Sequence, residues 1–187
     1  MSARDGSETM PMNQTTMELK GDREIVIART FNGPARIVFD AWTKPELVER
    51  WWAPKTRHVG VVECEADVRP GGYYRYVLSL QNGHRFAFSG TYNEVTPPTR
   101  LVYTQIYEPT AAGANPHDPA VVITVTFDER DGKTHLVSRS LCPSKDVRAA
   151  IIASGMEHGM RETMDQLNEL VASLDADYAD WTGRRLR

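Results

Sequence analysis

Three acidic residues in the first half of the chain alternate at every second position. Glu63, Glu65 and Asp67 would therefore share one face of an extended strand. Neighbouring carboxylates can serve as a general acid and a general base, but a solvent-exposed strand face carries the same pattern. We favour the exposed face, so these residues are weak candidates for catalysis.

The histidines are the next group with useful chemistry, and they show no spacing typical of a metal site. They are His58, His84, His117, His135 and His158. His158 falls on a predicted helix and faces either the rim of a cavity or solvent, of which solvent is favoured. The sequence has no GxSxG, P-loop or dinucleotide-binding fingerprint. We therefore expect no metal ion and no cofactor, and no catalytic residue can be assigned.

Composition is that of an ordinary globular protein and argues against two classes of partner. The 187 residues suit one domain, and a net charge of −3 argues against nucleic acid, which needs a basic face. The apolar runs are too short to span a bilayer, and the N-terminus lacks the apolar segment of a secretion signal. Cys64 and Cys142 form no CxxC motif, which indicates a reducing cytosol. The expected location is cytoplasmic, with no membrane partner.

The elements that would position functional side chains begin with a strand and two short helices. Residues 24–31 are rich in β-branched side chains and predict the strand. Apolar residues at helical spacing over 37–42 predict the first helix. Thr43 and Glu46 then resemble a capping box for a second helix that ends near residue 51.

After these helices the pattern changes to strands separated by turns. Six strands are expected, at residues 59–68, 73–80, 85–95, 100–108, 120–129 and 135–142. Asn82-Gly83 and Asp131-Gly132 are typical hairpin turns, which implies an antiparallel sheet. In the turn before the strand at 73, the consecutive glycines Gly71 and Gly72 suggest a positive φ.

A long helical segment follows the last strand. Ser144 is its expected N-cap, an apolar stripe continues to about residue 174, and a kink is expected at Gly155 or Gly159. Lying across a curved sheet of about six to seven strands, this helix would cover the concave face and leave a cavity. The predicted class is α+β.

The predicted organisation is a single domain with short extensions. The domain covers residues 21–174. Residues 1–20 are expected to be a flexible N-terminal extension, and residues 175–187 a frayed C-terminal tail.

Several short motifs occur in the order found in a known superfamily. They are residues 29–34 (RTFNGP), 38–46 (VFDAWTKPE), 50–54 (RWWAP), 69–72 (RPGG), 90–95 (GTYNEV), 98–102 (PTRLV) and 125–127 (VTF). With this order of elements, the chain resembles the SRPBCC superfamily, also called START-like or helix-grip. The closer resemblance is to the bacterial branch named after the C-terminal domain of the heat-shock-protein 90 ATPase activator. The last helix of that branch often carries a Gly-Trp pair, where this chain has Gly159-Met160.

Period-two alternation and the resemblance together indicate which side chains face the cavity. The expected ligand-binding residues are Trp52, Tyr74, Tyr76, Phe88, Tyr103, Ile123, Ser138, Met156, Met160 and Met164. Ser138 and Ser140 are polar positions on an otherwise apolar wall. We favour hydrogen bonds to nearby protein groups or simple exposure over partners supplied by a ligand or water. Arg75 and Arg139 fall on the outer face, where we expect cross-strand ion pairs.

Three functions remain open from the sequence. The favoured one is binding of a small hydrophobic or amphipathic molecule in the cavity. The resemblance also implies a cyclase-, aromatase- or hydrolase-like enzyme, or a protein that interacts with a chaperone, although the fold hosts unrelated activities. A homodimer is left open.

Overall fold

The computed structural model describes residues 14–115 and 117–185, with side chains up to residue 177. It contains an eight-stranded sheet in the order β1-β2-β8-β7-β6-β5-β4-β3, and every neighbouring pair is antiparallel. The strands are β1 (Thr16–Lys20), β2 (Glu24–Phe31), β3 (Gly60–Ala66), β4 (Tyr73–Ser79), β5 (Arg85–Thr96), β6 (Arg100–Glu108), β7 (Val121–Arg130) and β8 (Lys133–Leu141). The predicted antiparallel α+β fold is confirmed.

The eighth strand lies in the segment that we expected to be a flexible extension. Residues Thr16–Lys20 form β1, which pairs with β2 from Thr16 opposite Ala28 to Lys20 opposite Glu24. The expectation of flexibility over residues 1–20 is therefore wrong for this part, while residues 1–13 lie outside the described residues. A five-residue edge strand is too short to show a clear alternating pattern in sequence.

Two short helices follow β2, as predicted, but their boundary differs from the expectation. The helices are α1 (Ala35–Thr43) and α2 (Pro45–Val48), and a 3-10 turn, η1, covers Lys55–Arg57. Thr43 is the last residue of α1, and its hydroxyl donates to the carbonyl of Phe39 at 2.8 Å. The predicted capping box is therefore wrong, because that hydroxyl bonds back into its own helix.

The predicted long helix is divided in two. Ser144 caps α3 (Lys145–Ala153) and accepts a hydrogen bond from the backbone N–H of Val147, as expected. Gly155, with a φ of +75°, separates α3 from α4 (Met156–Arg185). The kink is thus at Gly155, and the helical backbone continues through most of the expected tail.

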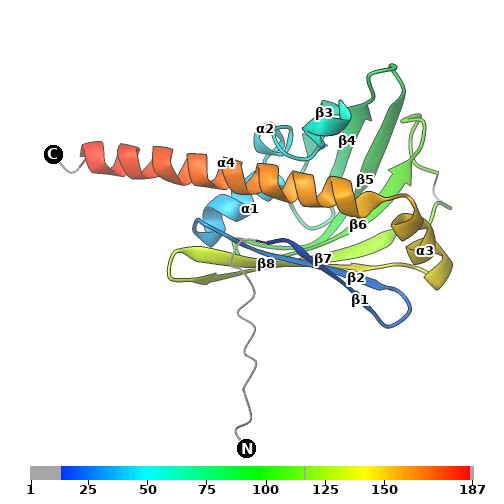
Figure 1. Cartoon of the computed structure of the whole chain (residues 1–187), viewed down its shortest axis with the longest axis horizontal. Coiled ribbons are helices and arrows are strands. Elements are labelled where there is room, and N and C mark those ends of the chain that lie inside the picture. Colours follow the sequence, from blue (N-terminus) through cyan, green and yellow to red (C-terminus); the bar gives the residue numbers. More distant parts are fainter. Residues whose placement is uncertain (1–13, 116, 186–187) are drawn as a thin grey trace, which may run out of the picture.

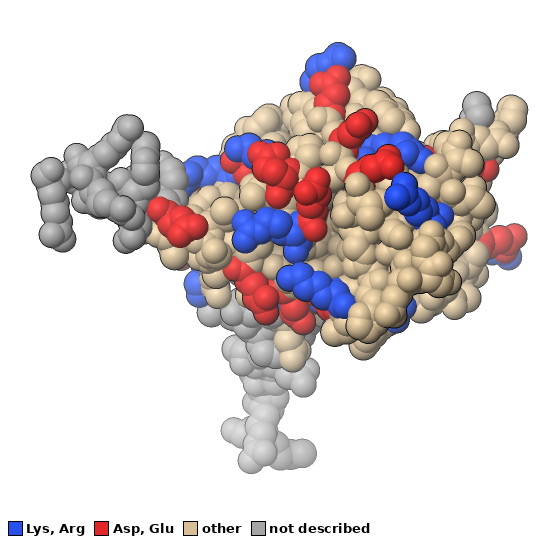
Figure 2. Space-filling model, turned by 90° about the horizontal axis from the view of Figure 1, so that it is seen from above, with Lys and Arg blue, Asp and Glu red and all other residues tan. Residues whose placement is uncertain are grey.

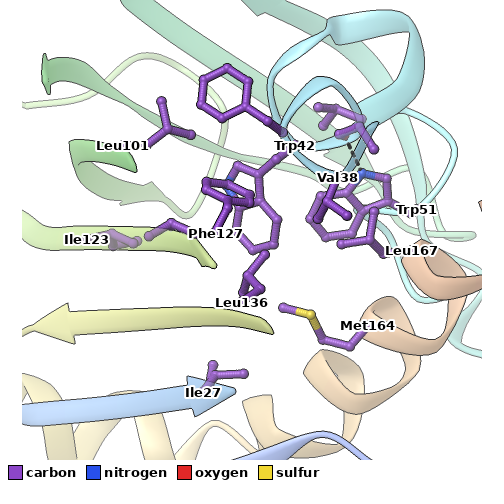
Figure 3. Close-up of a cluster of buried hydrophobic side chains, with 14 of the residues drawn as sticks. Ile27, Val38, Trp42, Trp51, Leu101, Ile123, Phe127, Leu136, Met164 and Leu167 are labelled. Atoms are coloured by element: carbon purple, nitrogen blue, oxygen red, sulfur yellow. Dashed lines mark hydrogen bonds between the residues drawn. The ribbon is translucent and has the colours of Figure 1, made fainter. Parts of the chain in front are cut away.

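Helix α4 runs across the concave side of the curved sheet, and α1 and α2 lie beside it (Figure 1). The main core fills the space between them. Met164 reaches from α4 toward Leu136 on β8, and Trp42 and Trp51 lie beside each other near Leu167 (Figure 3). The indole N–H of Trp51 donates to a backbone carbonyl of α1, at Ala41, over 2.8 Å. This bond fixes the chain after α2 against the core.

The outer face of the sheet carries a buried ion pair. Arg75 on β4 donates to the carboxylate of Glu108 on β6 at 2.8 Å, and the Ser89 hydroxyl donates to the same carboxylate at 2.6 Å. Arg75 also donates to the carbonyl of Ala111, which ties the following loop to the sheet. A second pair joins Arg139 to Glu24 at 3.8 Å. The predicted outer-face ion pairs are confirmed.

The glycine turn before β4 has the predicted backbone. Gly71 has a φ of +82°. A Cβ at Gly72 would lie 1.8 Å from the carbonyl oxygen of Asp67. One glycine is required by its backbone angle and the other by a close approach.

No helix within the described residues is long and apolar enough to cross a membrane. On the face seen in Figure 2, acidic and basic side chains are interspersed.

Candidate functional site

A cavity of about 580 Å³ lies between the first turns of α4 and the concave face of the sheet. Its lining comes from most elements of the fold: Ile27, Trp42, Trp51, Trp52, Pro54, Arg57, Val59, Leu78, Leu80, Phe86, Phe88, Tyr103, Gln105, Ile123, Ser138, Ser140, Met156, Gly159, Met160, Thr163 and Met164. This volume falls within the range of about 300–1,000 Å³ that is typical of small-molecule sites.

The structure brings eight of the ten predicted site residues to this cavity. They are Trp52, Phe88, Tyr103, Ile123, Ser138, Met156, Met160 and Met164. Tyr74 and Tyr76 face the same side of the sheet, as predicted, but they border a much smaller void of about 10 Å³ with Tyr92. Both rings are packed within the core instead.

The tyrosines of this packed cluster hold one another in place. The hydroxyl of Tyr74 donates to the carbonyl of Thr104 at 2.9 Å, and the ring of Tyr76 lies 5.3 Å from that of Trp52. Burial raises the pKa of Tyr74 and Tyr76, and it raises the pKa of Tyr92 to about 12. These phenols are therefore neutral at physiological pH and act as packing and hydrogen-bonding groups.

Tyr103 closes the cavity on the side of this cluster. Its oxygen accepts a hydrogen bond from the indole N–H of Trp42 at 3.4 Å. Burial raises the pKa of Tyr103 as well, so it also stays neutral. A neutral phenol anchored in this way presents an aromatic wall with a fixed position.

Two serines from β8 place hydroxyls on the same sheet wall as Tyr103, two strands away. Ser138 is only 6% exposed, and its side chain makes no hydrogen bond to any residue that the structure describes. Ser140 also borders the cavity without a described side-chain partner. The expectation that nearby protein groups bond these hydroxyls is therefore not met among the described contacts. Neither serine oxygen is fully buried, so both hydroxyls are open to the cavity and are suited to a ligand or to water.

Three polar lining residues were missed by the sequence analysis, Arg57, Gln105 and Thr163, of which Thr163 already donates to the carbonyl of Met160. Arg57 ends the 3-10 turn and is exposed, and Gln105 on β6 has a buried Oε1 without a described partner. Gln105 could have been found, because it continues the inward alternation of Leu101 and Tyr103. Arg57 follows a proline turn, where no periodic pattern assigns a side to a residue.

The segment that carries Arg57 is tied to α4. The amide of Gln166 donates to the carbonyls of Trp51 and Ala53, and its oxygen accepts from the N–H of Lys55. The carboxylate of Glu162 accepts from both the N–H and the hydroxyl of Thr56. These bonds lower the pKa of Glu162. The segment is therefore held in a defined place over the cavity.

The α4 wall is adaptable. Met156, Met160 and Met164 border the cavity, and thioether side chains can take many shapes. Gly159 borders it too, and a Cβ added there would meet only Pro54, at 3.7 Å. The Gly159-Met160 pair, which departs from the pattern of the related branch, therefore lies at the cavity.

The described lining contains no histidine, carboxylate, cysteine or lysine. The alternating acids Glu63 and Asp67 instead lie on the surface and pair with arginines, as at Asp67–Arg69 over 2.8 Å. His158 is exposed, in agreement with the favoured expectation. Burial raises the pKa of Cys64 to about 12, which disfavours the thiolate form. No group of potential metal ligands occurs among the described residues.

Comparison with known proteins shows where this architecture recurs. A Rhodobacter sphaeroides crystal structure superposes with a TM-score of 0.75 at 22% identity, covering 86% of this chain and 99% of its own. One from Nitrosomonas europaea gives 0.73 at 24% identity, covering 84% and 99%. A solution structure from Staphylococcus epidermidis gives 0.72 at 30% identity, covering 84% and 94%. No significant match exists among curated proteins.

A match to a family model shows which family the chain belongs to. The model described as "Activator of Hsp90 ATPase homolog 1-like protein" matches residues 32–172, which extends from the end of β2 into α4. The resemblance inferred from the short motifs is thereby confirmed. The chain belongs to the Activator of Hsp90 ATPase homolog 1-like family, within the SRPBCC superfamily.

Proposed function

We propose that this protein binds a small, largely apolar molecule in the cavity between α4 and the sheet. The observation that carries the proposal is a cavity of about 580 Å³ with an apolar wall and the unpartnered hydroxyl of Ser138. Ligand sites typically combine such an apolar lining with a few polar groups that orient the ligand.

The lining favours binding over chemical conversion. Its aromatic and methionine side chains supply contact area, whereas acid–base catalysis needs a titratable group near its working pH. The polar groups of the described lining are one neutral phenol, three aliphatic hydroxyls, an amide, indole N–H groups and a guanidinium. The enzyme and chaperone hypotheses stay predictions without a structural observation in their favour.

A neutral fluorescent probe, N-phenyl-1-naphthylamine, tests the proposal. We expect saturable binding at one site per chain, with energy transfer from the tryptophans that line the cavity. Met160→Trp should weaken binding by about tenfold, which corresponds to about 1.4 kcal/mol, because the larger ring would occupy the space. This change restores the Gly-Trp pair of the related branch, so the variant is expected to fold.

His158→Trp is the matched control, since it adds an indole to the same turn of α4 on an exposed side. It should leave probe affinity within about twofold of wild type. Circular dichroism must first show that both variants melt cooperatively. Wild-type protein that binds no probe up to the solubility limit, or a folded Met160→Trp variant that binds as tightly as wild type, would contradict the proposal.

A further inference from the structure

The charge at the cavity is unbalanced. Arg57 is the one formally charged residue in the described lining, and its side chain makes no hydrogen bond or salt bridge to a described residue. The charge of Arg57 helps to lower the pKa of Glu162, but that carboxylate already accepts two hydrogen bonds from Thr56. The guanidinium therefore keeps its donors free for another partner.

Arg57 also marks the side on which the cavity opens. Together with Leu80 it borders both the cavity and an open surface depression formed with Gln81 and Asn82. Since Arg57 is exposed and Ser138 is only 6% exposed, the two polar contacts lie at different depths. A ligand that enters from this side meets a cation at the mouth and hydroxyls on the inner wall.

We propose a ligand class for this site: an apolar molecule that carries one carboxylate. This proposal rests on the proposed function. The carboxylate would lie at the mouth against Arg57, whose planar fork of donors matches that group. The apolar body would lie inside, against Trp52, Phe88 and the methionines of α4. The described lining contains no carboxylate, and Glu162, which interacts electrostatically with Arg57, lies outside it.

The position of Arg57 favours this role because its backbone is already fixed. Residues 51–56 are held to α4 by Gln166 and Glu162, so little backbone order remains to be lost when an anion binds. The guanidinium nevertheless stays in contact with water, which screens its interaction with an anion. The expected selectivity is accordingly moderate and sensitive to salt.

Two probes with one ring skeleton provide the test. N-phenyl-1-naphthylamine is neutral, and 8-anilinonaphthalene-1-sulfonate adds a single anionic group. Arg57→Gln should weaken binding of the anionic probe by at least about threefold at low salt, which is the scale of an exposed charge pair. Binding of the neutral probe should stay within about twofold.

Lys55→Gln is the matched control, because Lys55 is an exposed cation two residues away that does not line the cavity. It should leave both probes unaffected. In a second arm, dodecanoate should displace the neutral probe from wild type at a lower concentration than methyl dodecanoate does, and Arg57→Gln should remove that difference.

The outcomes separate this proposal from the general one. Loss of affinity for both probes in Arg57→Gln, an equal effect of Lys55→Gln, or equal displacement by acid and ester would overturn the carboxylate assignment while leaving apolar binding intact. Failure of the neutral probe to bind wild type would overturn both.

Discussion

Gly159 offers the sharpest test of the idea that this cavity is kept open at a cost in folding stability. It lies in the first turns of α4, has no positive φ, and borders the cavity. A glycine in a helix is less stable than alanine by about 0.5–1 kcal/mol. An added Cβ would meet only Pro54 at 3.7 Å, an ordinary contact. Nothing in the packing therefore requires a glycine here.

Gly159→Ala should raise the free energy of unfolding by about 0.5–1 kcal/mol. Gly159→Leu should raise it by about 1 kcal/mol or more, since leucine is also a good helix former and would bury part of its side chain in the cavity. For a chain of this size, about 1 kcal/mol corresponds to a rise of roughly 2–4 °C in melting temperature. The same leucine should lower affinity for N-phenyl-1-naphthylamine by filling ligand space.

Thermal unfolding and probe titration on the same samples measure both effects. His158→Leu, on the exposed side of the turn, is the control and should leave probe affinity unchanged. The reasoning fails if Gly159→Leu is less stable than wild type, which would mean that the wall cannot accept it. It also fails if the stable variant binds the probe as tightly as wild type, because the cavity would then not be the binding site.

Two further predictions concern buried polar groups. Burial raises the pKa of Glu108, but the hydrogen bonds from Arg75 and Ser89 and the charge of Arg75 outweigh burial, so the pKa is lowered overall. The ionised Glu108 carboxylate therefore stabilises the fold above the unfolded pKa of about 4.3, and this stabilisation is lost as the pH falls through the folded pKa. Chemical denaturation of Glu108→Gln from pH 7 to pH 3 should show a shallower decline than wild type, and identical slopes would contradict this. Ser138→Ala should not lower stability, because its hydroxyl has no described partner, whereas Thr134→Val should cost about 1 kcal/mol, because the buried hydroxyl of Thr134 donates to Gly33 at 2.8 Å. Equal losses in the two variants, measured by their denaturation midpoints, would show that Ser138 is bonded after all.

Period-two alternation in the sequence was sufficient to assign faces of the sheet. It placed Phe88, Ile123 and Ser138 inward, and all three border the cavity. It also gave the correct face for Tyr74 and Tyr76, but it wrongly placed them at the cavity. Alternation gives the face of a strand and not the position of the cavity along it. Trp52 and Tyr92 fill the space over that part of β4, so the two tyrosines became core residues.

Features set by contacts distant in sequence could not be predicted. Strand β1 exists because β2 offers it a free edge, and its own five residues carry little signal. Arg57 reaches the cavity because Gln166 and Glu162, more than 100 residues later, hold the preceding turn. No local pattern around Arg57 contains that information.

Some departures from optimal stability lie at the cavity, although Nε of Arg29 and Oδ1 of Asn168 are also buried without a described partner and do not line it. Gly159 gives up helix stability, and Gln105 has a buried Oε1 without a described partner. Both border the same cavity, whereas the buried carboxylate of Glu108 on the outer face has all its bonds. Natural proteins tend to tolerate such costs where function needs them. Two such costs at the cavity add support to a binding role there.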